Sequence, residues 1–244
     1  MWEGDGLNSE QNILVSWMHL SQPIAPWLGI AIILAASRLL LAATGEYVRR
    51  CGPHAEISRK ILHVGIGTIL LACPWLFDRV WPVVLLAAIY VGLLIARRYF
   101  APLQYHVAGV IYGVERQSKG EYYFPLMVAA LFAGADGERL LFLIPMSLLV
   151  YADAAAALIG THYGTAHFHT PGGRKSIEGS AAFSLTAFIT ALVPLLLTAE
   201  RPPDKSLLIA ATITVLGVVV EACSWNGLDN VAVPLSAFLI LRLM

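Results

Sequence analysis

Long apolar segments separated by short polar stretches run through the whole chain. Eight such segments are expected, at residues 26–43, 57–77, 81–96, 122–134, 140–160, 177–198, 206–223 and 230–244. At 1.5 Å per residue the fifth segment is about 31 Å long, which is enough to cross a bilayer. The fourth and eighth segments are short for a full crossing. The pattern predicts an all-α, polytopic membrane helix bundle with about eight spans.

Composition supports this class of protein. Of 244 residues, 58% are hydrophobic and 13% are charged, whereas about a quarter of a typical soluble domain is charged. The formal net charge is zero, and we expect no nucleic-acid partner. Residues 1–22 are mildly amphipathic and are expected to lie at the membrane interface. Residues 23–244 are expected to form a single transmembrane domain.

Basic residues are unevenly divided between the two sides that alternating spans would create. The loops at 44–60, 97–121, 161–178 and 221–230 hold ten: Arg49, Arg50, Arg59, Lys60, Arg97, Arg98, Arg116, Lys119, Arg174 and Lys175. The opposite side holds five: Arg79, Arg139, Arg201, Lys205 and Arg242. Because loops rich in Lys and Arg stay in the cytoplasm, both termini are expected on the non-cytoplasmic side. The membrane would be the inner or plasma membrane in a bacterium.

Four of the expected helices begin on this cytoplasmic side, and three are preceded by Arg, Lys or Ser. These basic clusters lie at 59–63, 116–121 and 174–180. The first turn of a helix offers free N–H groups and the positive end of the helix dipole, both of which attract anions. The clusters therefore suit a highly charged anion such as a nucleoside triphosphate.

Two carboxylates lie near the ends of expected helices, where the helix dipole is negative, rather than near their starts. Asp153 and Glu221 lie in the cytoplasmic halves of their segments, near negative helix ends. A charged side chain at the centre of a membrane helix costs roughly 2.5–3.5 kcal/mol, so it usually has a partner or a function. Together with Asp229, the two carboxylates form a set of oxygen ligands suited to Mg²⁺.

The stretch from Asp153 to Ser180 contains both a carboxylate within an apolar segment and a basic cluster at the start of a helix. An aspartate is followed by spaced glycines, a polar loop, a basic pair and the start of the next apolar segment. The residues that fill this pattern are Asp153, Ala156, Gly160, Gly164, Arg174, Lys175, Ser176, Glu178, Gly179 and Ser180. Alone, Gly160-x-x-x-Gly164 is more typical of helix packing; the basic pair that follows favours a phosphate site.

In this pattern the chain resembles the CTP-dependent polyprenol kinases, which include dolichol kinase and phytol kinase and are related to the CDP-diacylglycerol synthases. The nine-residue spacer, 165–173, is longer than is usual in that family. Three further runs carry the resemblance, which covers about residues 57–235. They are R-K-x-x-H at 59–63, R-x-S-x-G-E at 116–121, and Glu221 followed by Asp229 and Asn230.

The resemblance implies transfer of the CTP γ-phosphate to a long-chain isoprenoid alcohol such as phytol, farnesol, geranylgeraniol, dolichol or another polyprenol. It also implies roles for individual residues. The nucleotide is expected to contact Arg59, Lys60, His63, Arg116, Ser118, Gly160, Gly164, Arg174, Lys175, Ser176, Glu178, Gly179 and Ser180. Mg²⁺ is expected on Asp153, Asp229, Glu221 and Asn230. The catalytic residues are expected to be Asp153, Lys175, Glu121 and Glu221, with either glutamate as the base.

Other functions stay open at this point. The same CTP site would serve cytidylyl transfer to a lipid phosphate or phosphorylation of diacylglycerol. A transporter could use Asp153 and Glu221 as a cation path, although no chain of ionisable residues crosses the bilayer. The sequence also leaves a homodimer open.

Overall fold

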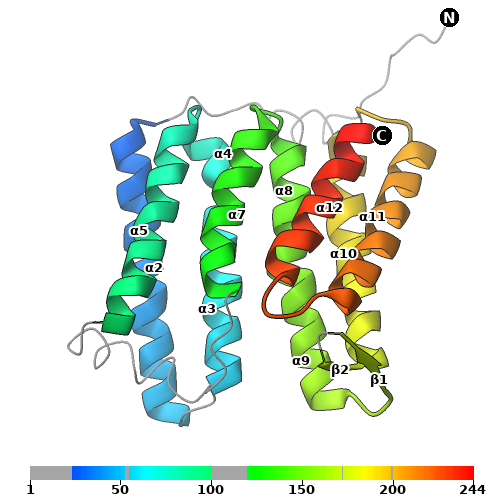
Figure 1. Cartoon of the computed structure of the whole chain (residues 1–244). Coiled ribbons are helices and arrows are strands. Elements are labelled where there is room, and N and C mark those ends of the chain that lie inside the picture. The colour runs from blue at the N-terminus through cyan, green and yellow to red at the C-terminus, as the bar shows by residue number, and fades with distance from the viewer. Residues whose placement is uncertain (1–23, 53–54, 100–119, 172, 199) are drawn as a thin grey trace, which may run out of the picture.

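The structure is a computed structural model, and it describes residues 24–52, 55–99, 120–171, 173–198 and 200–244. Its elements are α2 (Pro26–Cys51), α3 (Ala55–Leu70), α4 (Cys73–Leu76), α5 (Val80–Tyr99), α7 (Gly120–Ala135), α8 (Arg139–Ser147), η1 (Leu148–Ala152), α9 (Asp153–Tyr163), β1 (His167–Thr170), β2 (Gly173–Ser176), α10 (Ile177–Thr198), α11 (Pro203–Cys223) and α12 (Asp229–Leu243). Figure 1 shows the long helices side by side, with successive ones running in opposite directions. The expected interfacial segment, 1–22, lies outside the described residues.

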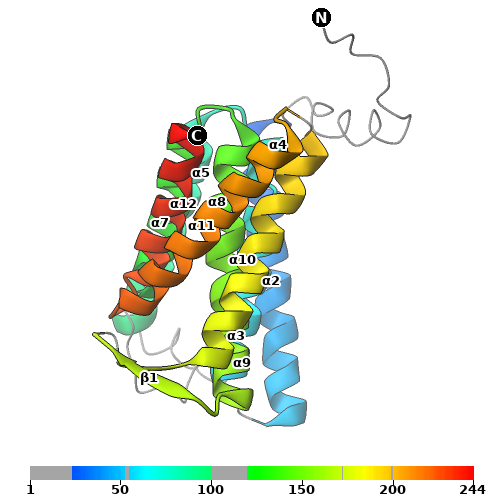
Figure 2. The ribbon, with the colours of Figure 1, turned by 90° about the vertical axis from the view of Figure 1, so that its right-hand side faces the viewer.

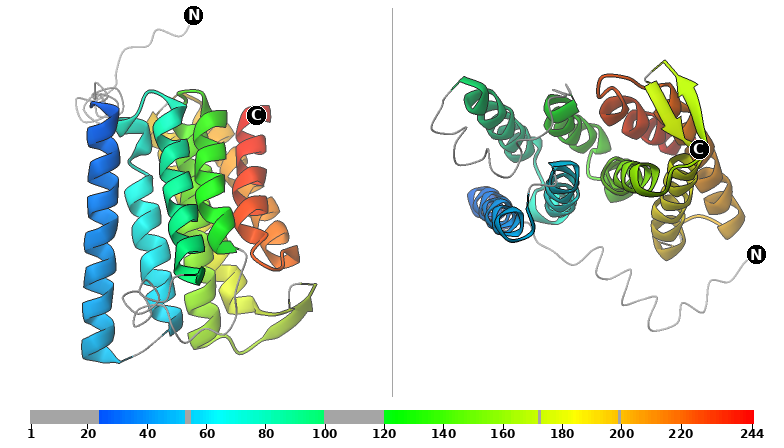
Figure 3. Two further views of the ribbon diagram at one scale, coloured as in Figure 1. Left: turned by 60° about the vertical axis from the view of Figure 1, so that its left-hand side comes forward. Right: turned by 90° about the horizontal axis from the view of Figure 1, so that it is seen from below.

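Viewed along the helices, the bundle has two neighbouring groups (Figure 3). The first contains α2, α3, α5 and α7. The second contains the continuous rod α8–η1–α9 together with α10, α11 and α12. The groups meet where α7 packs against α8 and α12, and where α3 packs against η1 and α9. Residues of α3 and α9 are thereby neighbours although they are far apart in the sequence.

Within the described residues, five helical segments are long and apolar enough to cross a membrane: Pro26–Cys51, Ile57–Leu76, Arg139–Tyr163, Ile177–Thr198 and Pro203–Cys223. A sixth, Val80–Ala96, is apolar but shorter. Helices α7 and α12 have only 16 and 15 residues. The all-helical membrane bundle is therefore confirmed in outline, while the number of eight spans and the side of each terminus stay predictions.

The expected boundaries differ from the structure mostly at helix ends. Helix α2 extends eight residues beyond the predicted end at residue 43, to Cys51. The second expected segment is split, because α3 ends at Leu70 and the short α4 follows with a proline in its first turn. Proline lacks the N–H that an uninterrupted helix would need there.

The cytoplasmic loop predicted after residue 160 contains a two-stranded antiparallel ribbon that sequence analysis did not predict. Strands β1 and β2 pair His167 with Ser176, Phe168 with Lys175 and His169 with Arg174. The ribbon reaches from the ends of α9 and α10 to below the turn between α11 and α12 (Figure 2). This hairpin brings residues of the stretch from Asp153 to Ser180 towards α11 and α12.

Candidate active site

Asp153 is positioned by a local departure from α-helical geometry. Residues Leu148–Ala152 form a π-helical turn, and the Asp153 N–H donates to the carbonyl of Leu148, five residues earlier. Pro145 precedes this turn within α8 and has no N–H to donate. Because π turns rotate the residues that follow them, and occur often at functional sites, this irregularity helps to set where the Asp153 carboxylate points.

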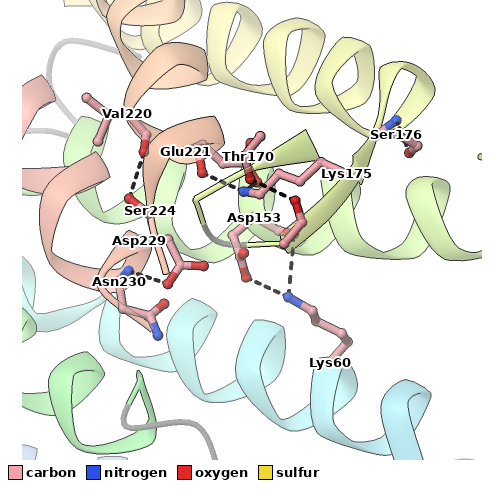
Figure 4. Close-up of polar contacts among 12 residues, drawn as sticks. Lys60, Asp153, Thr170, Lys175, Ser176, Val220, Glu221, Ser224, Asp229 and Asn230 are labelled. Atoms are coloured by element: carbon pink, nitrogen blue, oxygen red, sulfur yellow. Dashed lines mark hydrogen bonds and ion pairs between the residues drawn. The ribbon is translucent and has the colours of Figure 1, made fainter. Parts of the chain in front are cut away.

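Lys60 of α3 is the main partner of Asp153. Its Nζ lies 2.6 Å from Oδ2 of Asp153 and also donates to the Asp153 carbonyl at 3.4 Å (Figure 4). Lys60 is only 3% exposed, so both charges sit where water is scarce. Removing either partner of such a pair would leave an uncompensated buried charge.

His63 lies one turn beyond Lys60 and completes this part of the site. Its Nε2 lies 3.8 Å from Oδ2 of Asp153 and makes a 3.0 Å hydrogen bond with the carbonyl of Leu149. Because a carbonyl only accepts, Nε2 carries the hydrogen. The ring also contacts Phe124 of α7, with 4.9 Å between centroids. Helices α3, α7 and η1 therefore fix the imidazole together.

Lys175 forms a second pair, with Glu221 near the end of α11. Its Nζ hydrogen-bonds the Glu221 carboxylate and also its carbonyl (Figure 4). Glu221 is 8% exposed. Side chains alternate between the two faces of a strand, so Phe168 and Lys175 share the half-buried face of the ribbon. The hairpin thus places Lys175 against α11, in the second group of helices.

Asp229 lies beside these two pairs. Asn226 and Gly227 both have positive φ, 53° and 82°, and this tight turn brings the start of α12 back towards α11. One carboxylate oxygen of Asp229 accepts from the N–H of Asn230 at 3.1 Å. Burial raises the pKa of the Asp229 carboxyl, and the negative charge of Asp153 raises it further. The predicted metal ligands Asp153, Glu221, Asp229 and Asn230 are thus neighbours in space (Figure 4).

The motif glycines allow α9 and α10 to approach each other closely. A Cβ at Gly164, the residue after α9, would lie 2.8 Å from Cβ of Ser176, the residue before α10. A Cβ at Gly179 would lie 2.8 Å from the carbonyl of Ala156. The packing explanation, which sequence analysis considered less favourable for this motif, therefore applies to these glycines. Their contact with a nucleotide stays a prediction.

The other motif residues take different positions. Arg174 is exposed and lies on the opposite face of the ribbon from Lys175. The Ser176 hydroxyl is buried, accepts from the N–H of Gly179 at 3.1 Å and lies away from the charged cluster (Figure 4). Glu178 accepts three hydrogen bonds from Thr165 and Ala166. The basic pair therefore does not act as one unit in this structure.

Three predicted residues lie on neighbouring elements, and two lie outside the structure's described part. Arg59 is half-buried on α3 beside Lys60, Glu121 is half-buried in the first turn of α7, and Ser180 is half-buried on α10. Arg116 and Ser118 fall within 100–119, outside the described residues. Their predicted roles are not tested.

The two lysine–carboxylate pairs were not predicted. Lys60 and Asp153 are 93 positions apart, and Lys175 and Glu221 are 46 apart. The sequence indicated that each residue faces the same side of the membrane, but not which acid would meet which base. Among the described residues, no group of three or more His, Cys, Asp or Glu side chains is arranged to hold a metal ion.

The fold and this cluster together define a helical membrane protein with two lysine–carboxylate pairs, in each of which one partner, Lys60 or Glu221, is buried. The chain is 31% identical over 224 residues to the phytol kinase of Synechocystis sp., covering 90% of this chain and 94% of that protein. The chain therefore belongs to the family of phytol and polyprenol kinases. No family model matches the chain, and no solved structure matches it.

Proposed function

We propose that this protein is a membrane-bound kinase that transfers the γ-phosphate of CTP to a long-chain isoprenoid alcohol, with phytol as the first candidate. The observation that carries the proposal is the cluster of Asp153, Lys60, Lys175 and Glu221, of which Lys60 and Glu221 are buried, within a chain that is 31% identical to a phytol kinase. Phosphoryl transfer is mainly a problem of positioning and charge neutralisation, and a cluster of lysines and carboxylates suits both tasks.

The two ion pairs suggest how a nucleotide would be received. Phosphate oxygens would compete with the Asp153 and Glu221 carboxylates for the ammonium groups of Lys60 and Lys175. Each lysine released to phosphate leaves one carboxylate without its cation. Binding of the triphosphate would therefore free the acids that the reaction needs.

The chemistry of the freed oxygens fits Mg²⁺. This ion is usually held by one or two carboxylates together with substrate phosphates and water, so it does not need three protein ligands already gathered. Asp153 and Asp229 would hold it, with Glu221 or Asn230 as a further ligand. When bound, Mg²⁺ would neutralise negative charge on the phosphates during transfer.

The transfer itself needs an acceptor oxygen and a place for its proton. The alcohol oxygen forms a bond to the γ-phosphorus, the bond from that phosphorus to the bridging oxygen breaks, and CDP leaves. The alcohol proton passes to a carboxylate, for which Glu221 and Glu121 are the candidates. The hydrocarbon tail would stay in the bilayer, and the uneven division of basic residues supports a nucleotide site on the cytoplasmic face.

The experiment is a transfer assay with the full-length protein in detergent or nanodiscs. Protein, Mg²⁺ and γ-labelled CTP are incubated with phytol, farnesol, geranylgeraniol and a polyprenol. We expect a labelled lipid monophosphate and release of CDP, with less product from labelled ATP. A Glu200→Ala variant, changed at an exposed acid, should keep this activity.

Other products would identify other functions. Release of pyrophosphate with a lipid phosphate as acceptor would mean cytidylyl transfer, and labelling of diacylglycerol alone would mean a diacylglycerol kinase. Absence of any labelled lipid, together with Asp153-dependent uptake of a cation into vesicles, would mean a transporter. Each of these results would overturn the proposal.

A further inference from the structure

We propose that Glu178 is a positioning residue that holds the β1–β2 hairpin in place, so that Lys175 is presented to the triphosphate. This inference rests on the proposed function for its effect on catalysis. It assigns Glu178 a task different from contact with the nucleotide, and it follows from the hydrogen bonds at the base of the hairpin.

Glu178 binds the segment that leads into β1. One carboxylate oxygen, Oε1, accepts from the backbone N–H of Thr165 at 3.0 Å, from the Thr165 hydroxyl at 2.5 Å and from the N–H of Ala166 at 3.2 Å. Both Thr165 and Ala166 are exposed. A single side chain in the first turn of α10 therefore restrains the start of the hairpin from across its base.

A backbone hydrogen bond closes the same base. The N–H of Ile177 donates to the carbonyl of Ala166 at 2.8 Å. Lys175 lies two residues before Ile177, and its pairing partner in β1, Phe168, lies two residues after Ala166. A change in the direction of the hairpin at this base would therefore move Lys175, and the half-buried face of the ribbon that carries it, relative to Glu221.

Most side chains of the hairpin are not buried in the helix bundle. His167, His169 and Arg174 are exposed, Phe168, Thr170 and Lys175 are half-buried, and Ser176, the last residue of β2, is buried. Since a two-stranded ribbon is marginally stable by itself, its orientation depends on its anchors. Glu178 anchors one end of the hairpin, and the pair between Lys175 and Glu221 anchors the inner face.

The test compares Glu178→Ala, Glu178→Gln and Thr165→Ala with the wild-type protein. Glutamine keeps one acceptor oxygen, and its amide nitrogen replaces Oε2, which is buried without a hydrogen-bond partner in the structure. Loss of the acceptor should raise the KM for CTP by about tenfold with kcat within twofold, because Lys175 is then presented to the triphosphate less often while the reacting groups are unchanged. Glu178→Gln should restore most of the loss, and Thr165→Ala should show a smaller rise.

A second readout does not depend on activity. Arg174 is an exposed trypsin site within the hairpin, so limited proteolysis of the protein in nanodiscs reports how firmly the hairpin is held. Cleavage there should be several-fold faster in Glu178→Ala and unchanged in the control Glu200→Ala, which removes an exposed acid near the other end of α10. The melting temperature should stay close to that of the wild type.

The outcomes separate this inference from the proposed function. If the wild-type protein phosphorylates no alcohol, the proposed function fails, while the proteolysis comparison still tests the anchor. If Glu178→Gln is as impaired as Glu178→Ala, or if kcat falls while KM is unchanged, the carboxylate charge acts on the reactants and the inference is wrong. Unchanged cleavage at Arg174 would also overturn it.

Discussion

At the scale of single residues, Lys60 shows how a side chain can serve both structure and chemistry. It is 3% exposed and lies 2.6 Å from the Asp153 carboxylate, and it links α3 to α9. Sequence analysis assigned it to the nucleotide, and the structure gives it Asp153 as a partner. These two roles predict separate effects on stability and on activity.

Replacing Lys60 with methionine should destabilise the protein by about 3–5 kcal/mol, because a half-buried Asp153 loses its cation. The double variant Lys60→Met with Asp153→Asn should recover most of this stability, since no charge is then left unpaired. Neither variant should transfer phosphate. Thermal unfolding in detergent and the transfer assay would measure the two effects, and a double variant no more stable than Lys60→Met would contradict the pair's structural role.

Asp229 gives a prediction with a defined pH dependence. Its pKa in the folded protein is raised by burial and by Asp153, so the protein binds this proton more tightly when folded. The stabilising contribution is fully present below the ordinary pKa of an aspartate and is lost as the pH rises through the folded value. Asp229→Asn should therefore raise the melting temperature of the nucleotide-free protein at pH 8 and change it little near pH 3.5.

The same variant should lose most of its dependence on Mg²⁺ and most of its activity. Stability gained at the expense of activity is common where charges are held together for function. A lower melting temperature for Asp229→Asn at pH 8 would show that the carboxylate stabilises the fold, contrary to this prediction.

At the scale of elements, the contact between α9 and α10 depends on residues without side chains. A Cβ at Gly179 would lie 2.8 Å from the Ala156 carbonyl and 3.2 Å from Cα of Gly160. Both are backbone atoms that a rotamer change cannot move. Gly92 in α5 is the natural comparison, because a Cβ there would meet nothing within 4 Å.

Gly179→Ala should destabilise the protein by about 1–3 kcal/mol through overpacking. Gly92→Ala should be neutral or stabilising by up to about 1 kcal/mol, because alanine favours a helix more than glycine does. Thermal unfolding of both variants in the same detergent provides the comparison. Equal melting temperatures would mean that α9 and α10 are not so tightly packed.

At the scale of the whole molecule, the described cysteines offer a test of the orientation in the membrane. Cys51 at the end of α2 and Cys223 at the end of α11 are both exposed, whereas Cys73 is buried. The positive-inside bias predicts that the first two lie on the cytoplasmic side. A membrane-impermeant maleimide should label them in inside-out vesicles and leave them unlabelled in intact spheroplasts.

A Met244→Cys variant should show the reverse pattern, because the C-terminus is predicted to lie outside. Mass spectrometry of the labelled peptides would identify each site. Labelling of Cys51 and Cys223 from opposite sides would contradict the predicted arrangement of spans.

The sequence alone determined the class of fold and the type of chemistry. The evidence for both lies in local features of the chain: apolar segments, the uneven division of basic residues, and carboxylates such as Asp153 in apolar surroundings. The energetic cost or preference of each feature can be estimated without knowing which residue it contacts in the fold. The ordered motif from Asp153 to Ser180 indicated the family, which the 31% identity to a phytol kinase confirms.

The tertiary structure alone decided which charges meet and how the loop folds. Lys60 contacts Asp153 only because α3 packs against α9, and Lys175 contacts Glu221 only because the hairpin turns that face inwards. The alternation of the ribbon separates Arg174 from Lys175, although they are adjacent in sequence. Such pairings depend on contacts between residues 46 and 93 positions apart. Local patterns of polarity do not indicate which of these residues will meet.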